Sequence, residues 1–464
     1  MTPDPRDVRI AELERKVSEL MGIIAEKDRI IGELRKTIEE WRRGHRVRPR
    51  RGSRKMKAGE RKRPGRKKGH EAARRKMPDK ADRTVPRTKE SCDHCQGSLT
   101  PTGNSMEQLV ENVVPARVEV EKNVLYEYRC DCCGELQWSE LPAEYGPLPV
   151  PGQPMLSPEV RSMALELRYD MGLSFPKIVR HFGNLGLNVT AGGIYKMLER
   201  AAQRTAPVYE EIRERAQMSP YVNMDETSHW EDGERLWAWI VSNLELSLFH
   251  IDRSRGHKVI EKLLCEVNQD GEVVAPYEGT VVSDFMGAYC TCEWMVHQFC
   301  WSHLLRDADK EAELDPCLRT DTFRARLHDI YHDALIAQAA QDKGKKHGIR
   351  VRLGRLIADP ELGEHPDVAR LQGRAFTEFH GLLRFLDEPG LPAHNNQGEL
   401  DVRSLVLMRK VLYGTRSPGG TRTHAHFMSL SQTARKQGVN LGGFVTQALS
   451  AYHSGAPPPS IFPD

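Results

Sequence analysis

The chain has 464 residues, of which 39% are hydrophobic and 29% charged, with a formal net charge of +3. This length is about three times that of a typical single domain, so several folding units are expected. No apolar run approaches the ~20 residues that cross a bilayer, and the N-terminus lacks the features of a secretory signal, so we expect a cytoplasmic protein with no membrane partner.

The first predicted element is a coiled-coil helix over residues 8–41. Between Ile10 and Trp41, ten positions recur at alternating steps of three and four residues, and nine of them are apolar. β-Branched residues at every a position and mostly Leu at d favour two parallel strands, with Lys27 fixing the register. We therefore expect a homodimer or higher oligomer. An amphipathic helix on the chain's own core is the alternative.

Positive charge is concentrated in residues 42–90. This segment holds 22 Lys and Arg against 5 Asp and Glu, a local charge of +17, so the rest of the chain carries −14. It has no hydrophobic periodicity and contains several Pro and Gly, which predicts a flexible linker. Its charge favours DNA phosphates as the ligand, while a solvated linker without a ligand is the alternative.

Two C-x-x-C pairs predict a zinc-ribbon-like module over residues 91–140. The pairs are separated by 34 residues that include β-rich runs, and reduced thiolates at this spacing close a tetrahedral structural Zn²⁺ site. The expected ligands are Cys92, Cys95, Cys130 and Cys133. Unrelated buried thiols are the alternative, and His94 is a possible substitute ligand.

Residues 155–205 predict three short helices joined by tight turns that contain glycine. Ser157, Ser174 and Thr190 stand where N-caps are expected, and Pro158 follows the first of them. This pattern fits a helix-turn-helix DNA-binding domain, and a plain helical linker is the alternative. The side chains offered to a DNA groove by the third helix are Tyr195, Lys196 and Arg200.

Strand patterns dominate from residue 219 onwards. Tyr221–Asp225 and Thr280–Asp284 are short apolar runs that each end in an aspartate, at the sheet edge where open sheets bind ligands. Between them, two further apolar runs predict a hairpin around Asn243. A lone aspartate at a strand end is more often a turn former or a helix cap.

A third acid strengthens the functional interpretation. Glu399 opens a segment with helical spacing and shares one face with Asn396 and Arg403. Together with Asp225 and Asp284, it would form an all-oxygen site suited to Mg²⁺ or Mn²⁺. Two such ions activate a water or a 3′-hydroxyl and stabilise the leaving oxygen of a phosphodiester. Bare carboxylates repel one another, so this interpretation requires a metal.

Several motifs together resemble the DDE transposases of the insertion-sequence-66 family. They are Met224-Asp-Glu-Thr227, Val282-Ser-Asp-Phe-Met-Gly-Ala-Tyr289, Cys300-Trp-Ser-His-Leu-Leu-Arg306, Asn395-Asn-Gln-Gly-Glu399 with Arg403, and Ser429-Leu-Ser-Gln-Thr433. Four other segments precede these motifs in the order typical of that family: the predicted coiled coil, the basic linker, the cysteine module and the helical segment. One departure is Gly398, where the family more often has Ala.

The resemblance implies a multidomain α+β protein with a ribonuclease-H-like α/β catalytic domain over residues 215–450. It implies that Asp225, Asp284 and Glu399 are a metal-binding triad for Mg²⁺ or Mn²⁺. It further implies a transposase that cuts the ends of a mobile DNA element, joins 3′-OH ends to target DNA and works with small accessory proteins at the nucleoid. The alternatives are a catalytically silent DNA-binding regulator and a metal-dependent nuclease without joining activity.

The pair Cys300-x-x-His303 follows the second aspartate. We expect an accessory catalytic role for His303, against a core histidine or a separate metal site with Cys292 or His297. Arg306 would hold a phosphate or pair with Asp307 or Asp309. The further cations expected to contact DNA, in the third-acid helix and in the Gly-rich loop 413–423, are Arg403, Arg416 and Arg422.

Two segments complete the expected organisation. Residues 310–390 have a helical apolar pattern, which predicts an all-helical insertion inside the catalytic domain. Residues 451–464 form the tail, and we expect its Pro-rich part from residue 454 to be frayed.

Overall fold

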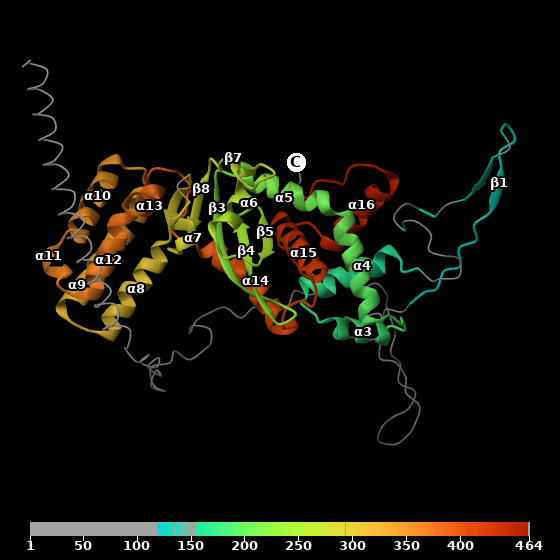
Figure 1. The fold of residues 1–464 in the computed structure, drawn as a ribbon, viewed down its shortest axis with the longest axis horizontal. Helices are drawn as coiled ribbons and strands as arrows, with labels where there is room; N and C mark the ends of the chain where they lie inside the picture. The colour runs from blue at the N-terminus through green and yellow to red at the C-terminus, as the bar shows by residue number, and fades with distance from the viewer. Residues whose placement is uncertain are drawn as a thin grey trace, which may run out of the picture. The chain divides into compact units, whose positions relative to one another are not determined.

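The computed structural model describes residues 118–133, 135–139, 141–142, 145, 155–292 and 294–462 (Figure 1). All the described residues belong to one compact unit of the chain, which spans residues 114–464. The predicted coiled coil 8–41, the basic linker 42–90 and the first cysteine pair, Cys92 and Cys95, lie outside the described residues.

A five-stranded mixed sheet forms the centre of the described unit, in the order β5-β4-β3-β8-β9. Its strands are β3 (Tyr221–Glu231), β4 (Glu234–Ser242), β5 (Ser247–Asp252), β8 (Thr280–Ser283) and β9 (Val296–Phe299). β3, β4 and β5 are antiparallel, whereas β8 and β9 run parallel to β3. The structure confirms the hairpin around Asn243, whose side-chain oxygen accepts hydrogen bonds from the backbone of Glu245 and Leu246.

The β3–β4 hairpin continues well beyond the end of β8. Its two-residue turn is Asp232-Gly233, and both residues have positive φ angles, of 47° and 88°. This is the combination that a tight hairpin turn compatible with strand twist requires. The smaller elements that follow β5 are α6 (His257–Leu264), β6 (Glu266–Val267), β7 (Val273–Ala275) and α7 (Gly287–Cys290).

Helices precede the sheet over residues 155–205, where the sequence predicts them, and one further helix follows that was not predicted. They are α2 (Pro158–Leu165), the π-helix η2 (Glu166–Asp170), α3 (Phe175–Asn184), α4 (Ala191–Arg204) and α5 (Ala206–Met218). Thr190 caps α4, because its hydroxyl accepts a hydrogen bond from Gly193 N at 3.0 Å. Ser157 and Ser174 occupy the expected N-cap positions, but neither makes a side-chain capping bond.

A group of helices lies beside β8 and β9, on the side of the sheet away from α3 and α4 (Figure 1). It contains α8 (Trp301–Leu314), α9 (Leu318–Ala339), α10 (Lys343–Ile357), α11 (Pro360–Gly363), α12 (Pro366–Thr377), α13 (Phe379–Leu383) and the 3₁₀ turn η3 (Arg384–Leu386). Phe323, Leu327 and Leu371 are among the residues of its own apolar core, which reaches the sheet at Val282 and Phe299. The segment expected as a helical insertion is therefore helical. No helix among the described residues is both long and apolar enough to span a membrane.

Three long helices complete the unit, namely α14 (Asn396–Leu412), α15 (Pro418–Gln437) and α16 (Leu441–Ser454). Helix α15 covers the free edge of β5, where Phe249 N donates to Ser429 Oγ at 2.8 Å and Ser247 N donates to Thr433 Oγ1 at 3.1 Å. An unpaired edge strand invites association with other chains, and these hydroxyls satisfy its outward-facing amides. The Ser429–Thr433 motif thus covers the outer edge of β5 and satisfies its backbone amides.

A buried ion pair fixes α14 against the same edge. Lys436 Nζ donates to Asp401 Oδ2 at 2.8 Å and to the carbonyls of Asn243 and Leu246 at 2.6 and 2.8 Å. Because removing one partner would leave the other charge buried, this contact holds α14 in one position relative to the β4–β5 turn.

The C-terminal segment differs from the expected frayed tail. Ile461 is fully buried and Phe462 nearly so. Ser460 Oγ and Ile461 N donate to the Glu211 carboxylate on α5, and the Arg215 guanidinium lies 5.0 Å from the Phe462 ring centre. The expectation is wrong because it was based on the proline content, whereas two apolar side chains at the end of the segment reach the core and hold the chain there.

We expect Gly414→Ala to lower the free energy of unfolding by about 1–3 kcal/mol. Gly414 has a φ of +99°, and a Cβ at this position would overlap the carbonyl group of Trp230, to whose oxygen Thr415 N donates. Gly183→Ala in α3 is the matched control, since its Cβ would meet no atom within 4 Å. Urea denaturation of both variants checks this, and equal midpoints would contradict the packing described here.

Candidate functional site

Asp225 and Asp284 lie on neighbouring parallel strands. The last paired residues of β3 and β8 are Asn223 and Val282, and each aspartate comes two residues later in the chain. Adjacent strands are about 4.8 Å apart, so equal offsets place the two carboxylates side by side. Asp284 follows the end of β8 as expected. The same expectation is wrong for Asp225, which lies inside β3 because this strand continues along β4, where it faces Ile240.

Both aspartates are oriented by bonds to nearby backbone. Asp225 Oδ1 accepts from Glu226 N at 2.8 Å, and Asp284 Oδ1 accepts from Met286 N at 2.8 Å. The second contact turns the chain into the short helix α7, which carries the fully buried Tyr289. Local bonds of this kind fix the direction of a short acidic side chain.

Glu399 enters from the first turn of α14. Its Oε1 lies 3.7 Å from His303 Nε2 and 3.3 Å from an Arg306 guanidinium nitrogen, both on α8. Arg306 therefore pairs with Glu399 and not with Asp307 or Asp309, the partners considered from the sequence. Those two acids bind Arg374 and His328 instead.

Asn395 links β3, which carries Asp225, to α14, which carries Glu399, and sequence reasoning did not single it out. Its buried side chain accepts from Asn223 Nδ2 at 2.9 Å and donates to the Met224 carbonyl at 2.7 Å. Its backbone N donates to Cys300 Sγ at 3.1 Å, and its carbonyl accepts from Glu399 N. The sequence features that could have pointed to this link are two asparagines, Asn223 in an apolar strand and Asn395 at the start of a helix.

The departure at Gly398 has a steric cause at this position. A Cβ on Gly398 would lie 2.7 Å from Asn395 Oδ1 and 3.1 Å from its Nδ2. Real Cβ atoms do not approach polar atoms this closely, so the glycine leaves room for the Asn395 side chain in the first turn of α14.

Burial and nearby negative charges dominate the electrostatics of the cluster. Burial, the larger effect, and the charges of Glu226, Asp284 and Glu399 together raise the pKa of Asp225 from 3.8 to about 7, against the opposing bond from Glu226 N. Because the charges of Asp284 and Glu399 both act on Asp225, the structure brings these two acids near it.

Glu226 is a fourth acid that the sequence analysis did not weigh. Its buried carboxylate accepts from Arg255 at 2.6 Å and from the Tyr289 hydroxyl at 2.9 Å. Burial raises its pKa, and the Arg255 contact opposes that rise. Since both of its oxygens already have protein partners, Glu226 fits a supporting position beside Asp225 better than a place among metal ligands.

The donor set fits a hard divalent cation. Asp225, Asp284 and Glu399 supply oxygen atoms only, which is the ligand type that Mg²⁺ and Mn²⁺ prefer. His303 and Arg306 pair with Glu399, whereas the described residues show no ion pair for Asp225 or Asp284. A bound cation would therefore supply the charge that the raised pKa of Asp225 indicates is missing.

Cys300 and His303 stand at the start of α8. Burial opposes ionisation of the Cys300 thiol, but the neighbouring His303 and the amide of Asn395 outweigh it and lower the thiol pKa. The contact with Cys300 raises the pKa of His303. Among the described residues, the cluster with ligand-type spacing is Cys300, His303 and Glu399, so the alternative that drew on Cys292 or His297 is not the one found.

The predicted DNA-contacting cations are all exposed, on four helices and one loop. Lys196 and Arg200 lie on α4, Arg306 on α8, Arg403 on α14, Arg422 on α15, and Arg416 in the loop before α15. Tyr195 differs, because its hydroxyl donates to Glu199 at 2.7 Å on the same helix. The Gly-rich loop is also shorter than expected, since α15 already begins at Pro418 with Ser417 as its cap.

The second cysteine pair lies in the turn of a small hairpin. Strands β1 (Glu127–Arg129) and β2 (Leu136–Trp138) are antiparallel, and Cys130 N donates to Glu135 O at 2.8 Å across the turn. Cys130 and Cys133 both fall within this turn, as a zinc knuckle requires, and their sulfur atoms are the ligand type that Zn²⁺ takes in structural sites.

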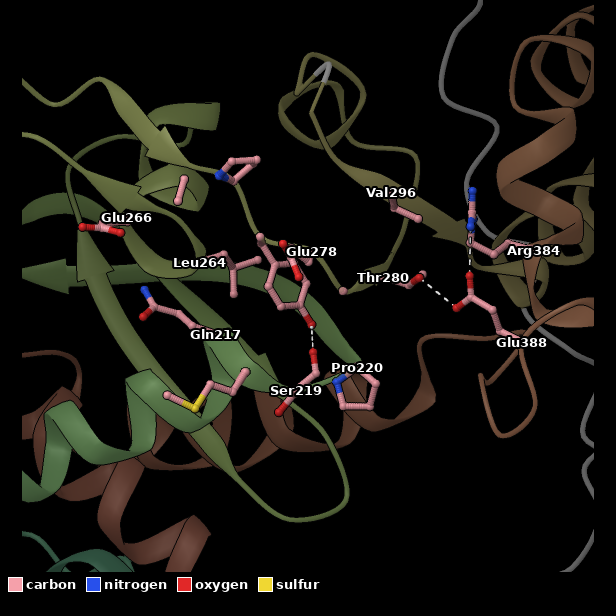
Figure 2. Close-up of a pocket in the computed structure, with 15 residues that line it drawn as sticks. Gln217, Ser219, Pro220, Leu264, Glu266, Glu278, Thr280, Val296, Arg384 and Glu388 are labelled. Carbon is pink, nitrogen blue, oxygen red and sulfur yellow. Dashed lines mark hydrogen bonds and ion pairs between the residues drawn. The ribbon is translucent and has the colours of Figure 1, made fainter.

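A cavity of about 790 Å³ lies at the opposite end of the strands from the acids. Pro220 and Thr280, at the starts of β3 and β8, are among its lining residues (Figure 2). Glu388 accepts from both Thr280 and Arg384 at 2.9 Å, which satisfies the charges on that wall. Since no candidate acid lines this cavity, we do not assign the chemistry to it.

Comparison with known proteins agrees with this organisation. Residues 153–423 match the family model described as "Transposase IS66 family", and residues 89–134 match "zinc-finger binding domain of transposase IS66". "Uncharacterized protein y4jO" of Sinorhizobium fredii is 25% identical over 171 residues, 36% of this chain and 52% of that protein, so the chain spans about half the length of this relative. Because the first family model alone covers more than half of the sequence, the chain belongs to the IS66 family of transposases.

Proposed function

We propose that the chain binds the ends of an insertion sequence and catalyses metal-dependent phosphodiester cleavage and strand transfer. The observation that carries this proposal is the raised pKa of Asp225, to which the charges of both Asp284 and Glu399 contribute. Two acids on adjacent parallel strands and a third on a helix suit a ribonuclease-H-like catalytic domain, to which we assign residues 215–450 with the helical insertion 310–390. Membership of a transposase family supports the same reaction class.

We infer that the three carboxylates together hold Mg²⁺ or Mn²⁺. When bound, the metal would activate the attacking water or 3′-hydroxyl and stabilise the leaving oxygen of the phosphodiester. Asp225 and Asp284 offer their oxygens from a rigid sheet. Asn395 positions Glu399 relative to that sheet through its bonds to Asn223 and Met224.

His303 and Arg306 have roles that depend on Glu399. Each contacts Glu399 Oε1, so both would lose this contact if the Glu399 carboxylate held a metal. Arg306 is then free to contact the scissile phosphate, as guanidinium groups do. His303 is then available as an accessory catalytic group within reach of the same phosphate.

DNA and a second copy of the chain are the partners we propose. Phosphate contacts would come from the basic linker 42–90, the zinc module 91–140 and the helix-turn-helix domain 155–205. The cations with assigned roles are Lys196, Arg200, Arg306, Arg403, Arg416 and Arg422. The coiled coil 8–41 would pair subunits so that two DNA ends are cut in one assembly, with small accessory proteins as further partners at the nucleoid.

The direct test uses purified protein, labelled terminal DNA and Mg²⁺ or Mn²⁺. We expect cleaved and joined products from the wild type, and a loss of at least about 100-fold in Asp225→Asn, Asp284→Asn and Glu399→Gln, because each variant removes a metal ligand. Glu364→Gln, which alters an exposed acid on α11's C-terminal side, is the matched control and should keep the wild-type rate. Bound but uncut DNA would favour a silent regulator, and nicks without joined ends a nuclease.

The metal-free protein should lose stability as the pH rises from about 4 to 7. In this window the folded protein keeps a proton on Asp225 that the unfolded chain has lost. The free energy of unfolding therefore falls by up to about 1.4 kcal/mol per pH unit. Asp225→Asn should reduce this slope, whereas the exposed control Asp270→Asn should not. At pH 8, Mg²⁺ should raise the melting temperature of the wild type more than that of Asp225→Asn. Thermal melts with equal slopes and equal metal effects would reject the cation site.

Metal analysis of the purified chain should find about one tightly held zinc. Cys130→Ser should lose this zinc, because it removes a thiolate from the proposed site. Cys132→Ser is the matched control, since it changes a neighbouring cysteine in the same turn that the site does not use. Retention of the zinc in Cys130→Ser would exclude this cysteine as a ligand.

A further inference from the structure

A second set of ligand-type side chains lies beside the acids and differs from them in chemistry. One ligand atom from each of Cys300, His303 and Glu399 lies within 4.8 Å of the other two. Cys300 is the N-cap of α8 and His303 is in its first turn, three residues later, while Glu399 approaches from α14. One sulfur, one nitrogen and one oxygen thus converge where two helices begin.

The spacing is close to that of a tetrahedral metal site. Bonds of about 2.0–2.3 Å to nitrogen, oxygen and sulfur place the ligand atoms about 3.5 Å apart. His303 Nε2 and Glu399 Oε1 are already 3.7 Å apart, and the Cys300 sulfur lies within 4.8 Å of a ligand atom of each residue. The Cys300 sulfur is held in place by the bond from Asn395 N, and this bond leaves sulfur lone pairs for another partner.

We propose that Cys300, His303 and Glu399 form a binding site for Zn²⁺ or a similar thiophilic divalent ion. A thiol and an imidazole select such ions over Mg²⁺, and three protein ligands leave a fourth position open to water. Arg306, which also contacts Glu399, has a side chain that is 61% exposed and can turn into solvent when the cation enters.

Binding at this site has a consequence for catalysis, and this consequence rests on the proposed function. Glu399 belongs both to this set and to the carboxylate triad. A zinc ion that takes Glu399 together with Cys300 and His303 removes it from Asp225 and Asp284. Low concentrations of Zn²⁺ therefore inhibit Mg²⁺-dependent cleavage by withdrawing the third acid, without occupying the all-oxygen site.

Cobalt titration of the full-length chain tests the site without reference to activity. In the chain as purified, with its zinc module already filled by Zn²⁺, added Co²⁺ reports thiolate ligation at this site by a charge-transfer band, and we expect this band to be lost in Cys300→Ser. Serine keeps an acceptor for Asn395 N, so the fold is preserved. His303→Gln, at a half-buried position, should weaken Co²⁺ binding at least about 10-fold. The buried Cys292→Ser is the matched control and should keep the band.

The outcomes separate this inference from others. A charge-transfer band that is unchanged in both Cys300→Ser and His303→Gln would overturn the proposed site. A band that disappears only in Cys130→Ser would also overturn it, because such a band would belong to the zinc module. For inhibition, each variant is compared with its own zinc-free rate, and Cys300→Ser should need at least about 10-fold more Zn²⁺ than the wild type. If the wild type does not cleave DNA in Mg²⁺, the proposed function fails while the cobalt result still decides the metal site.

Discussion

Repulsion between carboxylates at the edge of a mixed sheet is the constraint on which the site depends. Asp225 is held beside Asp284 by strand register and near Glu399 by the Asn395 bonds, and its pKa of about 7 reflects its burial first and then the neighbouring negative charges. A fold that served only to bind DNA would gain nothing from assembling these charges. A bound cation would balance these negative charges. Relief of their repulsion would then contribute to the affinity for that cation.

The surrounding architecture keeps the third acid in place. Lys436 and Asp401 pin α14 to the β4–β5 turn, and the hydroxyls of α15 satisfy the outer edge of β5. Glu399 therefore sits on a helix that is fixed at its start by Asn395 and near its middle by an ion pair. What remains adjustable is the Glu399 side chain itself, which is 37% exposed and contacts His303 and Arg306. Both proposals made for this site depend on where that side chain goes.

Much of the fold could be predicted from the sequence, because strand alternation, helix caps and turn residues are local signals. These signals predicted the hairpin at Asn243, the cap at Thr190 and the helical character of residues 310–390. Asn395 could not be found this way, because its partners lie 95 to 172 residues away and only the fold brings them together. The packing of Ile461 and the pairing of Arg306 with Glu399 were missed for the same reason.

Diffraction from crystals of the chain with terminal DNA and Mn²⁺ tests the central claim most directly, because anomalous scattering locates the metal independently of activity. The account predicts Mn²⁺ within coordination distance of oxygens from Asp225, Asp284 and Glu399 together. Manganese found elsewhere, or bound to the two aspartates while Glu399 stays on His303 and Arg306, would contradict it.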